Sequence, residues 1–439
     1  MGNQSQGTDH FQGGEAMRKI SLFMLVGMIL LLAGTVGISR AEDAEVLPKG
    51  VWTVYLENKF YFPIDERYGP SGDVEDAATD FNATLGSNVF PGLADLETAL
   101  GLPPGSANIG DSVVSFEYKV DELTLLLGYG ITDKLTAGVK IPYLWLKNDV
   151  SARLDTANAT VGKNPLFGTP GDPFGGLAPL IPISLGGTPL TTEDTQKLLG
   201  GGLDVNGDGS IDIPGFGYKR FESWSDDGFG DIEAGLKYQY YQSDKWRLAF
   251  TGGIRFPTGK VDDPDNLVDK GFGTGAWALL FRAHNDYTGI KNLVLDATFS
   301  YDLYLPDRQT LRVPDDVDHP ITANKEKVDR DLGDVVKVET SAKYQFLKGA
   351  SLLLAYKYGH SFQDKVSGSK GFAYQSLEDE TNWTEHVIET GLSYSTLPLY
   401  LDKKFAIPLN ASLTYRNRFA GRNNVFKSEF IALAVQFYF

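Results

Sequence analysis

The stretch DVNGDGSID, residues 204–212, has the residue types and spacing of a calcium-binding loop. Carboxylate and amide side chains alternate with small residues, and Gly209 permits the sharp turn that such a loop needs. The final position of a complete loop lacks its bidentate Glu, because Gly215 stands there after Pro214. Two interpretations stay open, a weak Ca²⁺ site or a plain Asn-Gly and Asp-Gly turn. The first predicts oxygen ligands from Asp204, Asn206, Asp208, Ser210 and Asp212.

The histidines do not form a recognisable catalytic arrangement. His360 and Ser361 are adjacent, so they would point to opposite faces of a strand instead of forming a nucleophile–base pair. His319 follows an acidic run in the segment 305–333, which a solvated loop explains more simply than a protease site. We expect His284 to be a hydrogen-bonded polar group rather than a base, and the sequence predicts no enzyme.

Composition excludes several further classes of function. The 439 residues contain no Cys, which excludes disulfides and thiolate metal sites. The net charge of −17 disfavours nucleic acid as a partner, because such a surface repels phosphates.

Residues 1–41 read as a signal peptide. Basic residues at 18 and 19 precede an apolar run from Ile20 to Val36, and small residues at 39 and 41 provide a cleavage site before Glu42. The true start is expected at Met17. The alternative is an N-terminal membrane anchor, for which the run is slightly short. Residues 42–50 then form a short periplasmic N-terminus, too short to plug a pore.

The chain after residue 50 alternates apolar and polar residues. In VKVETSAKYQF, residues 336–346, every second residue is apolar or uncharged and the residues between are polar, which is the period of a strand with one wet face. Twelve such segments are expected, most of 10–17 residues. Their approximate ranges are 51–62, 112–131, 135–154, 229–242, 246–257, 273–288, 292–304, 334–346, 350–366, 382–396, 405–420 and 424–439.

Connection lengths point to a membrane barrel. Short turns alternate with long segments, which include 63–111 and 155–228, and strands of this length can cross a bilayer. The chain ends in FIALAVQFYF, and the terminal Phe439 resembles the signal by which outer-membrane proteins are recognised by the barrel assembly machinery. The sequence therefore predicts an all-β, transmembrane antiparallel β-barrel of about twelve strands over residues 51–439. The alternative is a secreted β-sandwich, whose strands would be shorter.

The face opposite the apolar one carries many charges, which would line the barrel lumen. Two interpretations follow: the charges pair and brace a nearly filled barrel, or they line a wet passage. The predicted lumen residues include Lys140, Asp231, Glu233, Lys237, Arg247, Arg255, Arg282, Asp296, Lys337, Glu339, Lys343, Lys357, Glu385, Glu389 and Arg416.

The segment 155–228 is the predicted gate of such a passage. It is rich in Gly and Pro, and TTEDTQKLL at 191–199 predicts a short helix capped by Thr191 or Thr192. A loop of this length is commonly functional.

Three stretches carry a family resemblance: LLLGYGITDKLTAGVKIPY (125–143), GFGDIEAGLKY (228–238) and RFPTGK (255–260). They resemble outer-membrane proteins of the MetA pathway of phenol degradation, over most of residues 112–439. The resemblance implies a transporter that takes up small hydrophobic or aromatic compounds. The long segments 63–111 and 155–228 depart from the usual pattern.

The sequence thus predicts a channel or transporter in the outer membrane, with lipid and lipopolysaccharide around it. Acidic loop tips would share divalent cations with the lipopolysaccharide, or would form an ordinary solvated surface. The alternative function is a filled barrel that serves as a structural or interaction protein without transport.

Overall fold

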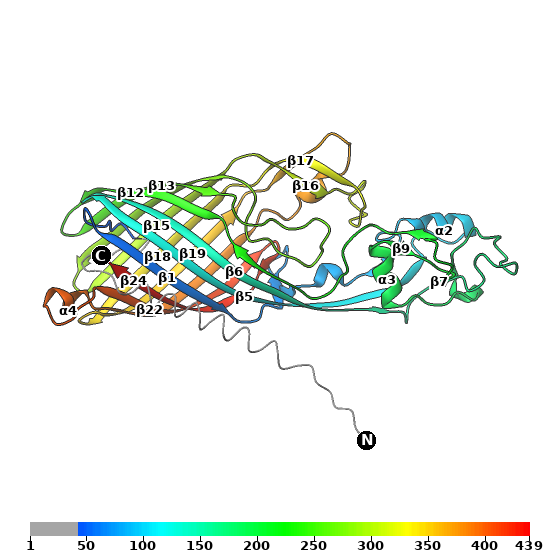
Figure 1. The fold of residues 1–439 in the computed structure, drawn as a ribbon, viewed down its shortest axis with the longest axis horizontal. Coiled ribbons are helices and arrows are strands. Elements are labelled where there is room, and N and C mark those ends of the chain that lie inside the picture. Colours follow the sequence, from blue (N-terminus) through cyan, green and yellow to red (C-terminus); the bar gives the residue numbers. More distant parts are fainter. Residues whose placement is uncertain (1–42) are drawn as a thin grey trace, which may run out of the picture.

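The computed structural model describes residues 43–439, so the predicted signal peptide lies outside the described residues. Within this range twelve antiparallel strands form a closed ring, because β1 pairs with both β5 and β24 (Figure 1). The predicted strand number is confirmed. The strands are β1 (Trp52–Tyr61), β5 (Asn108–Thr132), β6 (Leu135–Asp155), β12 (Ile232–Gln242), β13 (Trp246–Phe256), β14 (Ala278–Ile290), β15 (Leu293–Tyr304), β18 (Val335–Leu347), β19 (Ala350–Ser361), β21 (Thr384–Ser395), β22 (Leu409–Arg422) and β24 (Glu429–Tyr438).

Alternation along the strands separates a lipid face from a lumen face. In β24, Ala432 and Ala434 are 2% and 4% exposed, whereas Leu433 between them is 51% exposed. Phe439 pairs with Trp52 through two backbone hydrogen bonds, which joins the last strand to the first. Strands can cross lipid only when their backbone groups are paired in a closed ring. The chain is therefore a transmembrane β-barrel of an outer membrane, as the sequence predicted.

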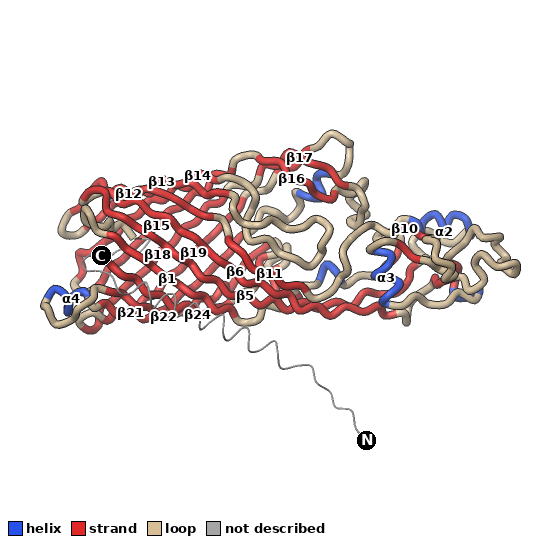
Figure 2. Tube along the Cα trace, in the orientation of Figure 1, coloured by secondary structure: helices blue, strands red, loops and turns tan. Residues whose placement is uncertain are grey.

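The two ends of the barrel differ. Four tight turns and the C-terminus lie at one end, which is the periplasmic end in barrels of this type (Figure 2). A fifth connection there, residues 396–408, is longer and contains the short helix α4 (Leu397–Leu401). The long connections leave the opposite, extracellular end.

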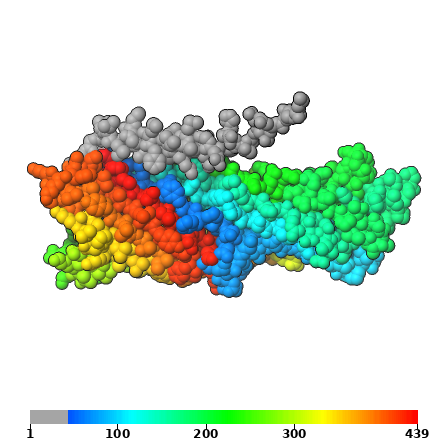
Figure 3. All heavy atoms as spheres, turned by 90° about the horizontal axis from the view of Figure 1, so that it is seen from below, coloured from blue at the N-terminus to red at the C-terminus, as the bar shows by residue number. Residues whose placement is uncertain are grey.

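Two strands extend far beyond the barrel. β5 and β6 have 25 and 21 residues and stay paired from Thr132–Leu135 to Asp111–Asp155. Their outer halves carry a folded lobe, the tip lobe, which stands clear of the barrel wall (Figure 3). The lobe combines β4 (Thr84–Gly86), α2 (Gly92–Leu100), β7 (Val161–Lys163), β8 (Leu180–Pro182), η2 (Ile183–Leu185), α3 (Thr192–Leu199), β9 (Gly202–Leu203) and β10 (Ile213–Pro214).

The tip lobe has its own apolar core, formed by both long segments. Phe90 and Leu93 from the first segment pack with Leu198 and Leu203 from the second. Helix α3 begins as predicted, because the Thr191 hydroxyl accepts from the Asp194 N–H at 3.1 Å. Each segment alone would expose its apolar residues, so the two fold together.

A further sheet covers part of the extracellular end: β16 (Asp307–Arg312), β17 (Lys325–Asp331) and β20 (Lys365–Ser367), followed by η3 (Tyr374–Leu377). Arg312 at the end of β16 is buried and stacks on Tyr218 at 3.8 Å. It donates hydrogen bonds to the carbonyl oxygens of Phe216, Gly217 and Thr322 and forms an ion pair with Asp265. One side chain therefore ties three extracellular loops together.

The remaining elements are short and lie at the extracellular end. β2 (Glu66–Tyr68) pairs with β3 (Val74–Asp76) and β23 (Val425–Phe426), and β11 (Trp224–Phe229) pairs with β6. A 3₁₀ turn, η1 (Thr79–Phe81), completes the first long connection. No helix within residues 43–439 has the length and apolar character to cross a membrane.

Candidate functional site

The lumen is the candidate functional site, and its predicted charges meet in ion-paired clusters. The largest cluster surrounds Glu233. Arg255 contacts Glu233 Oε1 at 2.7 Å and Asp302 Oδ2 at 3.0 Å, and Arg282 lies 3.6 Å from Glu233 Oε2. Lys337 lies 3.9 Å from Asp302 Oδ2. These charged groups therefore contact one another along the inner face of the barrel, from β12 to β18.

A second cluster lies on β18, β19 and β21. Lys357 Nζ is 2.8 Å from Glu339 and 3.5 Å from Glu389. Nearby, Glu385 pairs at 2.8 Å with Arg418, a residue absent from the predicted set. Glu339 lies directly opposite Lys357 in the ladder between β18 and β19. In the ladder between β19 and β21, Lys357 lies opposite Val387, and Glu389 is two residues further along the same face. These pairs brace adjacent strands.

Four other predicted lumen residues have distinct environments. Asp296 accepts a hydrogen bond from Ser341 at 2.7 Å, and Arg416 lies 5.5 Å over the ring of Phe430. Lys343 acts electrostatically on Glu45. Asp231 sits where β12 begins and accepts from the backbone N–H groups of residues 259 and 274, so it anchors an extracellular loop.

The N-terminal segment enters the lumen, contrary to the sequence-based expectation. Residues 42–50 were expected to be too short for a plug, yet Ala44 is fully buried and Leu47 is 1% exposed. Ala44 donates its N–H to Asp286 Oδ1 at 3.0 Å, and Gln239 donates to the Ala44 carbonyl at 2.8 Å. We call residues 43–48 the N-terminal plug.

Charged side chains of the barrel bind Asp43 and Glu45 at the start of the plug. Lys237 donates to the carbonyl of Asp43 at 2.6 Å, and Arg247 forms an ion pair with Glu45. Arg247 also contacts Asp286, which is fully buried, at 2.9 Å. The sequence signal was present: inward-facing Lys237 and Arg247 needed acidic partners, and the acidic run EDAE lies a few residues before the first strand.

Two glycines of β5 make room for the plug backbone. A Cβ on Gly130 would lie 2.0 Å from the Pro48 carbonyl oxygen, and one on Gly128 would lie 3.3 Å from the Leu47 side chain. Leu47 donates its N–H to Thr136 on the neighbouring strand at 2.8 Å. The missing side chains at Gly128 and Gly130 therefore leave the space in which the plug backbone lies against β5.

The segment that was predicted as the gate, residues 155–228, lies mostly outside the lumen. Residues 161–214 of the segment 155–228 belong to the tip lobe, away from the barrel lumen (Figure 1). The remainder returns along the extracellular end, where Phe221 packs with Phe116 and Val268. Most of the expected gate therefore does not cover the lumen, because its apolar residues are buried against the segment 63–111.

The candidate calcium loop lies in the tip lobe. The two carboxylate oxygens of Asp204 accept from the N–H groups of Gly207 and Gly209 at 2.7 and 2.8 Å. The Ser210 N–H, then the Asn206 and Ser210 side chains, lower the pKa of Asp208. Residues 43–439 contain no grouping of three or more His, Cys, Asp or Glu that could hold a metal. Calcium binding at this loop stays a prediction.

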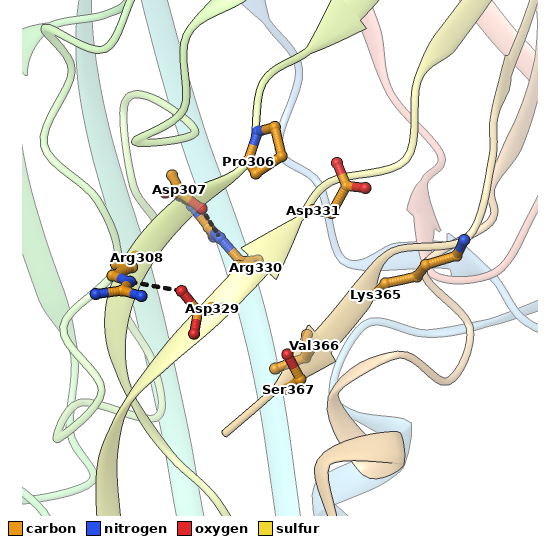
Figure 4. A pocket seen from close by; sticks show the side chains of 9 residues that line it. All are labelled: Pro306, Asp307, Arg308, Asp329, Arg330, Asp331, Lys365, Val366 and Ser367. Atoms are coloured by element: carbon orange, nitrogen blue, oxygen red, sulfur yellow. Dashed lines mark hydrogen bonds and ion pairs between the residues drawn. The ribbon is translucent and has the colours of Figure 1, made fainter. Parts of the chain in front are cut away.

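An open cavity of about 600 Å³ lies on the extracellular sheet of β16, β17 and β20 (Figure 4). Four of its six charged side chains form two ion pairs. Arg330 pairs with Asp307 at 2.7 Å, and Arg308 pairs with Asp329. This cavity is therefore a charged surface hollow, separate from the lumen.

Two histidines of the barrel wall, His284 and His386, have polar partners. His284 is 2% exposed and lies 2.9 Å from the Thr251 hydroxyl and 3.1 Å from that of Thr298. It is the hydrogen-bonded lumen group that the sequence predicted. His386 contacts the Tyr356 hydroxyl at 2.7 Å on the outer face.

A protein-family model matches the sequence. The family model described as "Putative MetA-pathway of phenol degradation" matches residues 183–423. No curated protein matches the sequence.

Several solved structures are similar. An outer-membrane channel from Pseudomonas putida F1 has 13% identity and a TM-score of 0.48, covering 92% of this chain and 100% of its own. A FadL homologue from Pseudomonas aeruginosa has 9% identity and a TM-score of 0.32, with 89% and 90% covered. A mutant of TodX, a monoaromatic hydrocarbon channel, has 11% identity and a TM-score of 0.35, with 89% and 91% covered.

Proposed function

Because this chain belongs to the protein family of the MetA pathway of phenol degradation, we propose that it is an outer-membrane channel for small molecules. The family description favours apolar or aromatic cargo. The observation that supports a channel best is the N-terminal plug. Within residues 43–439, a segment of six residues lies in the lumen, belongs to no strand and is joined to β1 through Lys49–Val51, so its departure would not require any of these strands to unfold.

The plug is the proposed gate, in place of the segment 155–228. Its contacts are hydrogen bonds and ion pairs around Asp286, Lys237 and Arg247, and water can replace each of them when the segment undocks. Cargo would enter from the extracellular end, beneath the loops tied by Arg312, and leave where the plug now lies.

Reconstitution tests this proposal. Wild-type protein and a variant lacking residues 43–48 are refolded into liposomes and planar bilayers, and uptake of phenol and benzyl alcohol is measured with ion conductance. We expect low flux for the wild type and higher flux for the deletion. A refolded deletion variant without flux would contradict the channel. Different gel mobility before and after boiling is the folding control.

A second candidate is a filled barrel without transport. The strand-to-strand ion pairs support it, since Lys357 with Glu339 and Glu389 acts as a brace between neighbouring strands. The tip lobe would then be the working surface. This candidate predicts no flux from either form of the protein.

We also propose three interactions that the sequence suggested. Phe439 ends the strand that closes the barrel, which supports its recognition by the assembly machinery; deleting it should lower the amount of assembled barrel in cell membranes. The loop at 204–212 would bind Ca²⁺ weakly and stiffen the tip lobe. Acidic loop residues such as Asp315 and Asp316 would share divalent cations with lipopolysaccharide, so chelation should loosen that contact.

A further inference from the structure

Three donor side chains of the barrel wall bind three consecutive residues of the N-terminal plug. Lys237 Nζ donates to the Asp43 carbonyl oxygen at 2.6 Å and lies 3.8 Å from the carboxylate of the same residue. The Gln239 amide donates to the next carbonyl oxygen at 2.8 Å, and Arg247 Nη1 forms an ion pair with the carboxylate of Glu45. Two residues of extended chain span about 7 Å, so these donors converge on a region that one small molecule can fill.

Arg247 divides its two terminal nitrogens between the wall and the plug. Its Nη2 lies 2.9 Å from Asp286, a fully buried residue of the neighbouring strand β14. Its Nη1 binds Glu45, whose side chain is 26% exposed. If the plug leaves, Arg247 keeps Asp286 as a partner and loses only Glu45. The contact with the plug is therefore the exchangeable one.

The charges around this contact favour an acidic occupant. The plug contributes two acidic groups, and the wall contributes three basic and two acidic groups. They are Asp43 and Glu45 from the plug and Lys237, Arg247, Lys343, Asp286 and Asp296 from the wall. Departure of the plug removes both of its carboxylates and leaves three basic groups against two acidic ones. A small anion can then replace the lost negative charge.

Other basic groups of the lumen have partners that stay in place. Arg255 contacts Glu233 and Asp302 at 2.7 and 3.0 Å, and Lys140 acts electrostatically on Glu233. These carboxylates belong to the strands of the wall, so a solute could displace them only by disturbing the barrel. The contact between Arg247 and Glu45 differs, because its acidic partner lies on a segment that can undock.

We propose that Lys237, Gln239 and Arg247 form a binding site for the carboxylate of a small organic acid, and that plug residues 43–45 occupy this site in the closed channel. Such an acid would open the channel by taking the place of Glu45. The inference rests on the proposed channel and its plug, and it names the chemistry of the ligand that releases the plug. The plug itself already presents a carboxylate to Arg247, and the planar guanidinium binds such groups with defined geometry.

Mass action sets the size of the effect. A ligand that binds only after the plug has left shifts the ratio of undocked to docked plug by one plus its concentration divided by its Kd. At ten times the Kd this shift is about 11-fold. A neutral molecule of the same shape has no charge with which to replace Glu45, so it should shift the ratio far less.

A thiol-labelling experiment measures plug release without relying on conductance. The chain has no Cys, so Val46→Cys places a single thiol on the partly buried middle of the plug. The full-length variant is refolded into liposomes, and its rate of reaction with a polar maleimide is measured with sodium benzoate, benzyl alcohol or sodium chloride at equal concentration. We expect roughly 10-fold faster labelling with benzoate at ten times its Kd, and little change with the other two.

Matched variants locate the site. Arg247→Lys keeps a positive charge beside buried Asp286 but loses the planar donor pair. In protein that lacks residues 43–48, it should weaken benzoate binding about 10-fold in calorimetry, the loss expected for one charged hydrogen bond. Arg255→Lys is the control, because it makes the same change on the same strand at a group that does not contact the plug; it should alter the affinity less than about twofold.

A second variant tests the competition itself. Glu45→Gln weakens the plug's own hold on Arg247, so about 10-fold less benzoate should release the plug of the full-length protein. An unchanged benzoate requirement in this variant would show that Glu45 does not compete with the acid and would overturn the proposal.

The remaining outcomes separate this site from the channel. Equal acceleration of labelling by benzoate and sodium chloride, or equal loss of binding in Arg247→Lys and Arg255→Lys, would mean a general charge effect and would overturn the site. Conductance of the plug-deleted protein with no effect of benzoate on labelling would leave the channel standing and refute the site. Release of the plug by benzoate without conductance in any refolded form would support the site and refute the channel.

Discussion

Weakening the N-terminal plug should open the channel, and the structure indicates how much weakening is needed. The contacts of residues 43–48 include two hydrogen bonds with charged groups, two with neutral groups, one ion pair and the burial of Leu47. At roughly 1–2 kcal/mol for each polar contact and ~2 kcal/mol for Leu47, they stabilise docking by about 10 kcal/mol. Ordering six residues costs about 6–12 kcal/mol. Docking is therefore favoured by no more than about 4 kcal/mol, which keeps the plug docked but easy to release.

Small changes should then shift the equilibrium strongly. Leu47→Ala removes a buried side chain and should weaken docking by about 2–3 kcal/mol, which shifts the ratio of docked to free plug roughly 30- to 150-fold. Gly130→Ala attacks the same contact from the barrel wall, because its Cβ would lie 2.0 Å from the Pro48 carbonyl oxygen. Gly138→Ala is the matched control, since its Cβ would meet no atom closer than 3.6 Å.

Single-channel recording measures the effect. We expect a higher open probability for Leu47→Ala and Gly130→Ala than for the wild type, and wild-type behaviour for Gly138→Ala. Altered gel mobility on boiling must confirm that each variant is folded. If both plug variants keep the wild-type open probability while folded, the plug does not control conduction and the reasoning fails.

Three further predictions concern other parts of the protein. Replacing residues 161–214 with a short Gly-Ser linker should leave conductance unchanged, because the tip lobe lies away from the lumen; a higher conductance would restore the loop as the gate. Glu339→Gln should lower unfolding stability by about 1–3 kcal/mol in denaturant titrations, because Lys357 loses its nearer partner, and an unchanged midpoint would exclude a brace. Asp208→Ala should abolish the heat of calcium binding that calorimetry measures for the wild type. If neither the wild type nor the variant releases heat, the loop is a plain turn and does not bind calcium.

The periodicity of the sequence determined the barrel. Period-two alternation of the kind seen in 336–346 places apolar residues on lipid, and chain closure then follows from the need to pair every backbone group. The sequence also determined which charges face inward, because parity along a strand fixes the side of each residue. Glu233, Arg255 and Lys337 lie in the lumen for this reason.

Tertiary structure decided what these groups contact. Parity does not reveal that Arg255 reaches Glu233 and Asp302 together, because that depends on the register of four consecutive strands, β12 to β15. The lobe formed by 63–111 and 155–228 was also hidden, since neither segment has strong periodicity and each buries its apolar residues only against the other. Local pattern carries no information on such long-range pairing.

For the N-terminal plug too, the sequence determined one part and the tertiary structure decided the rest. The sequence showed an acidic segment before β1 and unpaired basic residues inside the barrel, but the segment was judged by its length as too short to close a pore. Whether it enters the lumen depends on the space that Gly128 and Gly130 leave and on the positions of Asp286, Lys237 and Arg247. Those groups come from four strands, and only the closed barrel brings them together.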